Sequence, residues 1–334
     1  MKKFLFLAIA AAAMTSCSQD EVLEVAQKQA ISFGSAFVGN ATRAASATDP
    51  SYYTDGETEH TQLTTFNVYG TVNDVNIFDG VAITKGTAAY GAVWAQEEGT
   101  KTQYWVPGAS YLFDAVVDAT EVVTNQTTGL PETLKYTTST QTDMLHNRQE
   151  VASAAADQGV VAFEFTHLLS KVKFSIVNST VEDATNYQYV ITNATLTNVY
   201  TNGDYAVPAG TWSEQVVGTY ALDSKFEVSS AETEVNAREV LLIPGSAVGI
   251  SFTVELQTKD AEGNWATVSS DNKEYPAVAT LEANSAYHFI LNVGIGSPIQ
   301  FTATEMDEWD TVDDITVDTI TDPAVDEEGE GTDA

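Results

Sequence analysis

The sequence predicts an all-β protein, and three observations carry this prediction. Apolar and polar residues alternate over many short segments, turn-forming residues stand between the segments, and hardly any stretch has the period of an amphipathic helix. The alternation is clear at 31–33, 66–69, 161–165, 172–176, 189–191, 194–196, 240–243, 250–254, 287–291 and 299–301. Turns are predicted at 202–204, 208–210, 244–245 and 262–264. Many short strands at this spacing favour antiparallel β-sandwiches.

The length of 334 residues favours two domains, each able to bury its own core. A weakly patterned stretch at 149–159, interpreted as a short helix or a loop, precedes the strand pair at 160–177. We therefore place an N-terminal β-sandwich domain at 44–160 and a C-terminal one at 161–310. Residues 311–334 follow as a C-terminal segment with an acidic end, for which we expect disorder from Pro323 onward.

The N-terminus has the pattern of an export signal. Lys2 and Lys3 precede an apolar run at 4–13, and small residues then lead to Cys17, so we expect a signal peptide at 1–16. The residues before Cys17 resemble the lipobox of bacterial lipoproteins, in which the cysteine is acylated; the alternative is an incidental cysteine in an ordinary signal peptide. Because Cys17 is the only cysteine, no internal disulfide is possible and core packing alone must hold the exported chain together.

Residues 17–43 combine a lipidated tether with a candidate strand. The acidic residues after Cys17 resemble the surface-export signal of Bacteroidetes lipoproteins, although a solvated tether has a similar composition. In the following segment Ile31, Phe33 and Phe37 fall on one strand face. Arg43, among small residues before Ala44, is a candidate site for an arginine-specific protease, and the alternative is a simple surface arginine.

The strand followed by Thr42-Arg43-Ala44 resembles the fimbrillins of Bacteroidales, the subunits of protease-dependent type V pili. Four further segments are similar to that family, and together they span most of the chain: 103–108 with 111–113, 161–174, 242–244 and 287–309. The resemblance implies two transthyretin-like antiparallel β-sandwich domains in tandem. It also implies a lipoprotein precursor in the outer membrane, held through lipid on Cys17, and later a cell-surface fimbrium.

The same resemblance implies assembly by donor-strand exchange after cleavage between Arg43 and Ala44. Removal of the first strand, with Ile31, Phe33 and Phe37, would open a groove that a strand from another copy or a related pilus subunit fills. The candidate donor strand is 313–319, extending toward Ile320, with Ile315 and Val317 on its apolar face. The alternatives for that segment are a last edge strand or part of a disordered tail.

Composition and motifs exclude several other functions. With 14 basic and 47 acidic residues, a formal charge of -33 is incompatible with nucleic-acid binding. The four histidines have no metal-ligand spacing, and we find no nucleophile elbow or phosphate loop, so we predict no metal, no cofactor and no catalytic residue.

Three hypotheses follow from the sequence. The leading one is a structural pilus subunit. The second is a surface adhesin or carbohydrate-binding lipoprotein on the same scaffold, as a pilus tip or a free receptor, for which Trp265 at a predicted hairpin tip is a candidate platform. An enzyme is a distant third, since nothing in the sequence points to a site.

Overall fold

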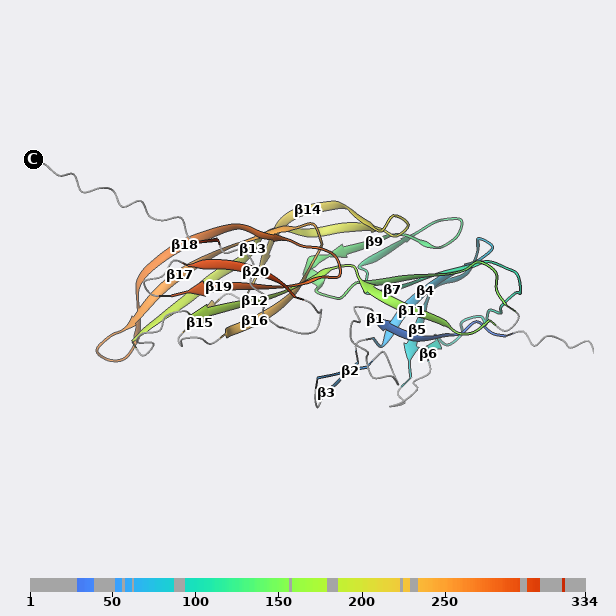
Figure 1. The fold of residues 1–334 in the computed structure, drawn as a ribbon, viewed down its shortest axis with the longest axis horizontal. Coiled ribbons are helices and arrows are strands. Elements are labelled where there is room, and N and C mark those ends of the chain that lie inside the picture. The colour runs from blue at the N-terminus through green and yellow to red at the C-terminus, as the bar shows by residue number, and fades with distance from the viewer. Residues whose placement is uncertain are drawn as a thin grey trace, which may run out of the picture.

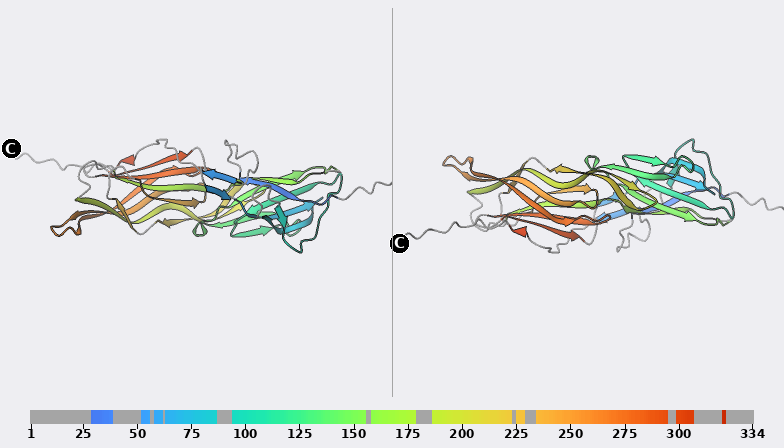
Figure 2. Two further views of the ribbon diagram at one scale, coloured as in Figure 1. Left: turned by 90° about the horizontal axis from the view of Figure 1, so that it is seen from below. Right: turned by 90° about the horizontal axis from the view of Figure 1, so that it is seen from above.

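The computed structural model describes residues 29–38, 52–55, 58–61, 63–86, 94–155, 158–178, 186–222, 225–228, 234–294, 299–306 and 320–321. Within these residues the protein is built of β-strands, and one 3-10 turn, η1 (Thr138–Thr140), is the only helical element. The all-β prediction is confirmed. Strands gather in two lobes along the long axis of an elongated molecule (Figure 1), and the turned views in Figure 2 show the same arrangement.

The first lobe is one seven-stranded sheet with the order β1-β11-β10-β7-β4-β5-β6. Its strands are β1 (Phe33–Val38), β11 (Val161–His167), β10 (Leu145–Val151), β7 (Tyr111–Val117), β4 (Thr65–Val72), β5 (Val75–Lys85) and β6 (Trp94–Gln96). The sheet is curled, and its two edges lie close together. Gln96 in the edge strand β6 donates a hydrogen bond of 3.1 Å to the carbonyl of Ile31, next to the other edge strand, β1. The sheet thereby encloses an aromatic core that includes Phe33, Phe66, Phe78, Phe113, Phe163 and Phe165.

The second lobe is a sandwich of two sheets. One has the order β16-β12-β19-β20-β21, formed by β16 (Glu234–Leu242), β12 (Ser170–Asn178), β19 (Ala286–Val293), β20 (Gln300–Met306) and β21 (Ile320–Thr321). The other has the order β18-β17-β13-β9-β8, formed by β18 (Trp265–Thr280), β17 (Ala247–Lys259), β13 (Tyr187–Ala206), β9 (Pro131–Thr137) and β8 (Glu121–Thr124); β14 (Thr211–Ala221) and β15 (Lys225–Val228) also pair with β13. Alternate residues of both sheets, such as Phe174, Leu196, Ile250 and Phe289, fill the core between them.

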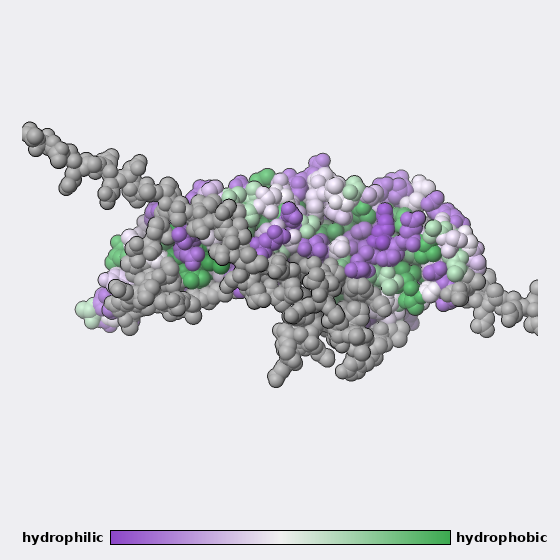
Figure 3. All heavy atoms as spheres, in the orientation of Figure 1, coloured by the Kyte–Doolittle hydropathy of each residue, from purple (hydrophilic) through white to green (hydrophobic). Residues whose placement is uncertain are grey.

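A small separate ribbon is formed by β2 (Tyr52–Asp55) and β3 (Thr58–Thr61). On the face drawn in Figure 3, hydrophilic residues are spread over both lobes and hydrophobic ones form only small groups. Among the described residues no helix is long and apolar enough to cross a membrane.

One sequence expectation needs correction. The turn predicted at 202–204 is wrong, because these residues continue β13, which is a single strand of 20 residues. Gly203 serves close packing there, since a Cβ at this position would lie 3.1 Å from Cε3 of Trp212. In the weakly patterned stretch at 149–159, β10 continues to Val151, and the described residues 152–155 and 158–159 form a loop, which is one of the two interpretations given for it. The other three predicted turns are confirmed, at 207–210, 244–245 and 260–264.

The two lobes meet without a free linker. Leu168 and Leu169, both buried, connect β11 of the first sheet directly to β12 of the second lobe. They belong to an apolar cluster, which we call the junction cluster, that also contains Tyr69, Val116, Leu130, Leu134, Tyr136, Met144, Val207 and Ile243. Relative motion of the lobes would expose this cluster, so we expect the molecule to behave as one stiff rod. The domain limits at 160 and 161 stay a prediction; the described hydrogen bonds place β11 in the first sheet and place β8 and β9 beside β13.

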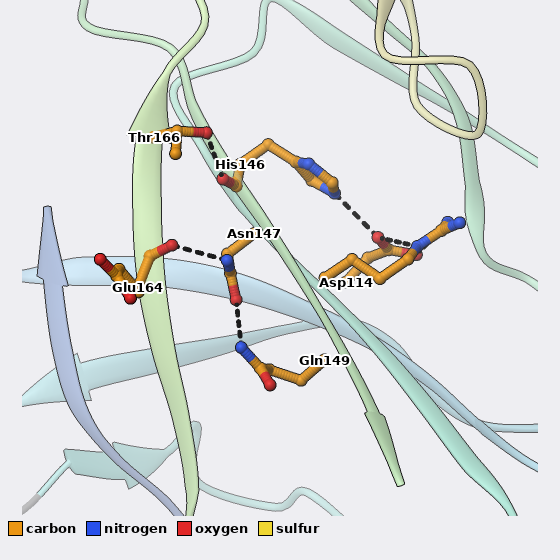
Figure 4. Close-up of polar contacts among 7 residues, drawn as sticks. Asp114, His146, Asn147, Gln149, Glu164 and Thr166 are labelled. Atoms are coloured by element: carbon orange, nitrogen blue, oxygen red, sulfur yellow. Dashed lines mark hydrogen bonds and ion pairs between the residues drawn. The ribbon is translucent and has the colours of Figure 1, made fainter. Parts of the chain in front are cut away.

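Beside the junction cluster lies a buried carboxylate with two basic partners. Asp114 in β7 is completely buried, its Oδ1 lies 2.8 Å from Nε2 of His146, and Arg148 donates bonds of 2.9 and 2.8 Å to its two oxygens. Figure 4 shows the His146 ring directed at Asp114. The His146 ring centre is also 6.5 Å from that of Tyr205 in β13, so this group faces the second lobe.

Burial alone would raise the pKa of the Asp114 carboxyl, but the hydrogen bonds and charges of His146 and Arg148 outweigh it and hold that pKa below its ordinary value. Asp114 therefore binds a proton less readily in the folded chain than in the unfolded chain. Its stabilising contribution is complete above the unfolded pKa of about 4 and is lost as the pH falls through the lower folded pKa.

We predict that Asp114→Asn lowers the free energy of unfolding at pH 7 by about 2 to 4 kcal/mol, because two basic side chains lose a buried ionic partner. The variant should also lose less stability than the native chain when the pH is lowered below about 4. Urea titrations at several pH values measure both effects. Asp271→Asn is a matched control, since Asp271 is exposed in its ion pair with Lys273 and should change stability by less than about 0.5 kcal/mol. Equal effects of the two variants would contradict this account.

Candidate functional site: the slot that holds the first strand

The segment before and including β1 is bound by hydrogen bonds on both sides. On one side the Ile31 N–H donates to the Gln103 carbonyl (2.8 Å), and the Trp105 N–H donates to the Gln29 carbonyl (3.0 Å). On the other side β1 runs parallel to β11, with Phe33 opposite Val161, and the Val161 N–H donates to the Ser32 carbonyl (2.9 Å). Residues 29–38 therefore fill a slot whose walls are β11 and the segment 103–105.

The side chains of this segment complete the first core. Ile31 and Phe33 are 2% and 4% exposed. The Phe33 ring stacks on Phe163, with 6.0 Å between ring centres, and meets Phe78 and Phe113 edge-on at 5.3 and 5.9 Å. Burying these two side chains contributes about 3 to 6 kcal/mol, at about 1.5 to 3 kcal/mol each. The core of the first lobe thus depends on residues that precede the rest of its strands by some thirty positions.

The predicted site residues fall partly inside the described structure. Ile31 and Phe33 lie in the slot. The backbone of Phe37, in β1, is paired with Glu164 of β11, after a register shift that follows Gly34. The side chain of Phe37 is outside the described part, as are Cys17, Arg43, Ala44 and the donor candidates Ile315 and Val317. Their roles stay predictions.

Beyond residue 306, the described part of the chain is β21, directly after the candidate donor. In β21, Ile320 and Thr321 pair antiparallel with Phe301 and Gln300 of β20. β21 is an edge strand of the five-stranded sheet and has only two residues. Within the described residues, β21 is thus held to the second lobe by its pairing with β20 alone.

Sequence reasoning missed the second wall of the slot. Residues 103–105 have no strand-like alternation of their own, and Trp105 is recognisable only as a buried aromatic that packs on Tyr111 with ring centres 4.7 Å apart. Among the described residues the indole N–H of Trp105 has no hydrogen-bond acceptor. Only a pairing over a long sequence distance, between Ala30 and Tyr104, identifies this wall.

A second candidate site is a pocket at the junction of the two lobes. A pocket of about 290 Å³ at the junction is lined by Gln141, Asp143, Lys171, Glu239, Val240 and Leu241. There Gln141 bonds to both the N–H and the carbonyl of Leu241, and Lys171 pairs with Glu239 at 3.2 Å, so the lining side chains satisfy one another. In the described ranges no three His, Cys, Asp or Glu side chains are grouped to hold a metal ion.

The aromatic platform predicted on the second lobe is present in part. Trp265, which begins β18 after the hairpin turn, is 37% exposed, and the Lys259 ammonium lies 4.9 Å from its ring centre. Trp94 and Trp105 are buried in the first core, as expected for most tryptophans. His167 and His288 are buried at 6% and 4% exposure within strands β11 and β19, so they occupy structural positions.

Comparison with known proteins identifies the family. A family model described as "Fimbrillin-like" matches residues 42–309, which is most of the chain, whereas no curated protein matches. Among solved structures, a fimbrial protein from Bacteroides vulgatus is similar, with a TM-score of 0.53 and 11% identity over 72% of this chain and 92% of that chain. A fimbrial assembly protein from Parabacteroides distasonis matches with a TM-score of 0.41 and 10% identity over 78% of this chain and 91% of that chain. The extent of the family match establishes that the chain belongs to the fimbrillin-like family.

Proposed function

We propose that this chain is a structural subunit of a cell-surface pilus, activated by cleavage at Arg43 and polymerised by donor-strand exchange. The observation that carries the proposal is the position of Ile31 and Phe33. These side chains complete the core of the first lobe, and their segment lies between β11 and residues 103–105, a short distance before Arg43 in the sequence. Membership of the fimbrillin-like family, a family of fimbrial structural proteins rather than known enzymes, supports it.

The proposed precursor is exported by residues 1–16 and anchored in the outer membrane through lipid on Cys17. An arginine-specific protease then cuts between Arg43 and Ala44, five residues after the end of β1. The cut separates β1 from the rest of the chain without breaking any strand that forms the walls of the slot.

Loss of the first strand leaves a subunit that needs a replacement. Two rows of backbone groups lose their partners, and the aromatic core opens to water. The burial of Ile31 and Phe33, about 3 to 6 kcal/mol, is comparable to the whole stability of many domains, so an empty slot is strongly unfavourable. A strand from another subunit restores both the hydrogen bonds and the core.

The proposed donor is 313–319, with Ile315 and Val317 directed into the slot of a neighbouring copy or a related subunit. Its release is favoured by the edge position of β21, which can detach while the pairing of β19 with β20 stays in place. We further propose that the mature subunit has two transthyretin-like domains, with the predicted limit at 160 and 161 moved to follow β11, which pairs in the first sheet, and that it becomes part of the cell-surface fimbrium.

A second candidate is a surface adhesin or carbohydrate-binding lipoprotein on the same scaffold. The half-exposed ring of Trp265, which stands at a hairpin end with Lys259 over it, favours this candidate because exposed aromatic rings stack on sugars.

The removable strand predicts a specific stability pattern. Phe33→Ala should lower the free energy of unfolding of the uncut precursor by about 3 to 5 kcal/mol, because it leaves a cavity among three phenylalanine rings. Chemical denaturation measures the loss, and Val75→Ala, at a valine that is 64% exposed, should change stability by less than about 0.5 kcal/mol. A Phe33 variant as stable as the Val75 control would show that the slot is not part of the core.

Cleavage is predicted to trigger assembly. Treatment of the soluble precursor, lacking residues 1–17, with an arginine-specific protease should yield a new N-terminus at Ala44 and a ladder of polymers on size analysis. Arg43→Ala should remain monomeric, and an unrelated protease site in place of residues 40–45 should restore polymerisation when its own protease is added. A stable cut monomer, with residues 18–43 released, would contradict the pilus-subunit proposal.

The adhesin candidate makes a different prediction. If sugars stack on Trp265, Trp265→Ala should reduce binding to a glycan array at least tenfold and leave polymerisation unchanged. Trp212→Ala serves as a control for nonspecific loss of binding, because the Trp212 indole is partly buried and donates a hydrogen bond to the Leu168 carbonyl. Absence of glycan binding by the native chain would eliminate this candidate.

A further inference from the structure

The part of the slot that surrounds Phe33 is shaped for an aromatic ring. Phe163 lies against one face of the Phe33 ring, and Phe78 and Phe113 meet it edge-on, at interplanar angles of 71° and 82°. Phe66 meets Phe163 edge-on, with ring centres 5.5 Å apart. We call the three rings of Phe78, Phe113 and Phe163 the ring cage.

The ring cage discriminates by size and shape. An aliphatic side chain in place of Phe33 would leave apolar space that water does not enter favourably, and the surrounding rings would lose both dispersion contacts and edge-to-face geometry. The Ile31 position, two residues away on the same face, holds a branched aliphatic side chain that is 2% exposed. The segment in the slot therefore has an aliphatic-x-aromatic pattern, and the ring cage specifies its aromatic member.

The C-terminal segment of this chain does not have that pattern. After Trp309 the sequence contains no phenylalanine, tyrosine or tryptophan, and the candidate donor offers Ile315 and Val317. If the donor runs in the direction of β1, Val317 enters the ring cage; if it runs in the opposite direction, Ile315 does. In either direction the cage receives an aliphatic side chain.

We propose that the strand which fills this slot in the assembled pilus comes from a different protein, a related subunit whose donor strand carries an aromatic residue two positions from a branched aliphatic one. This inference rests on the proposed function and deepens it by naming the partner. The slot then acts as a selectivity filter. Copies of this chain exchange strands with one another when no other subunit is present, as the cleavage prediction requires, but contacts between unlike subunits are favoured when both are available.

The test is a displacement assay on the complete soluble precursor. A site for an unrelated protease replaces residues 40–45, the N-terminus carries a fluorophore, and after cleavage the labelled first-strand fragment is displaced by added peptides. The peptides are 29–38, the native tail 311–321, and that tail with Val317→Phe or Ile315→Phe. Thr316→Phe is the matched control, because it adds the same ring on the opposite strand face.

The inference predicts that one of the two inward-facing variants, Val317→Phe or Ile315→Phe, displaces the fragment at a concentration at least tenfold lower than the native tail does. The Thr316→Phe tail should act like the native tail. If the native tail is as effective as both inward-facing variants, the aromatic preference is wrong while strand exchange stands. If no peptide displaces the fragment, including 29–38 itself in large excess, strand exchange fails and the partner assignment fails with it.

Discussion

The insertion of Phe33 among the rings of Phe78, Phe113 and Phe163 is the interaction on which the first lobe depends. Residues 29–33 bond to both sides of the first lobe, to Gln103 and Trp105 on one and to Val161 on the other. A strand that bridges two edges in this way contributes hydrogen bonds and apolar burial together. The first strand is joined covalently to the walls of the slot only through the chain that follows it. A cut after this strand therefore leaves both walls in place.

The composition makes apolar strand insertion a suitable basis for assembly. A formal charge of -33 repels copies from one another at long range, and salt screens this repulsion only in part. Since Cys17 is the only cysteine, copies lack any further thiol with which to cross-link through disulfides. A dry interface of backbone hydrogen bonds and buried rings is insensitive to these charges once formed. The junction cluster, with Leu168 and Leu169 in the direct connection between lobes, holds the two lobes together.

Much of the fold could be read from the sequence, and the remainder depends on long-range pairing. Alternation in Val161–Phe165 and Val172–Ile176 predicts β11 and β12, because one face of each strand is buried and the other is not. The parallel pairing of Phe33 with Val161 is set by the closure of the whole sheet, and no local pattern records it. Asp114 is the clearest failure of local reasoning: between the core residues Phe113 and Ala115 it should face water, yet the second lobe covers that face and His146 and Arg148 neutralise it. At the candidate site, the sequence pattern predicted the buried positions of Ile31 and Phe33. It did not predict the wall at 103–105 or the ring cage, because both depend on contacts between residues far apart in the sequence.

The central claim is that residues 29–38 are a replaceable part of the core, and hydrogen exchange at two amides tests it most directly. The Trp105 N–H bonds to Gln29 and the Val161 N–H bonds to Ser32, so both report occupancy of the slot, whereas amides of β19 in the second lobe serve as an internal reference. The account predicts slow exchange of both amides in the uncut precursor, fast exchange after cleavage and release of residues 18–43, and slow exchange again in the assembled polymer. Exchange rates that stay the same in all three states, relative to β19, would show that the first strand is not what protects this core and would contradict the account.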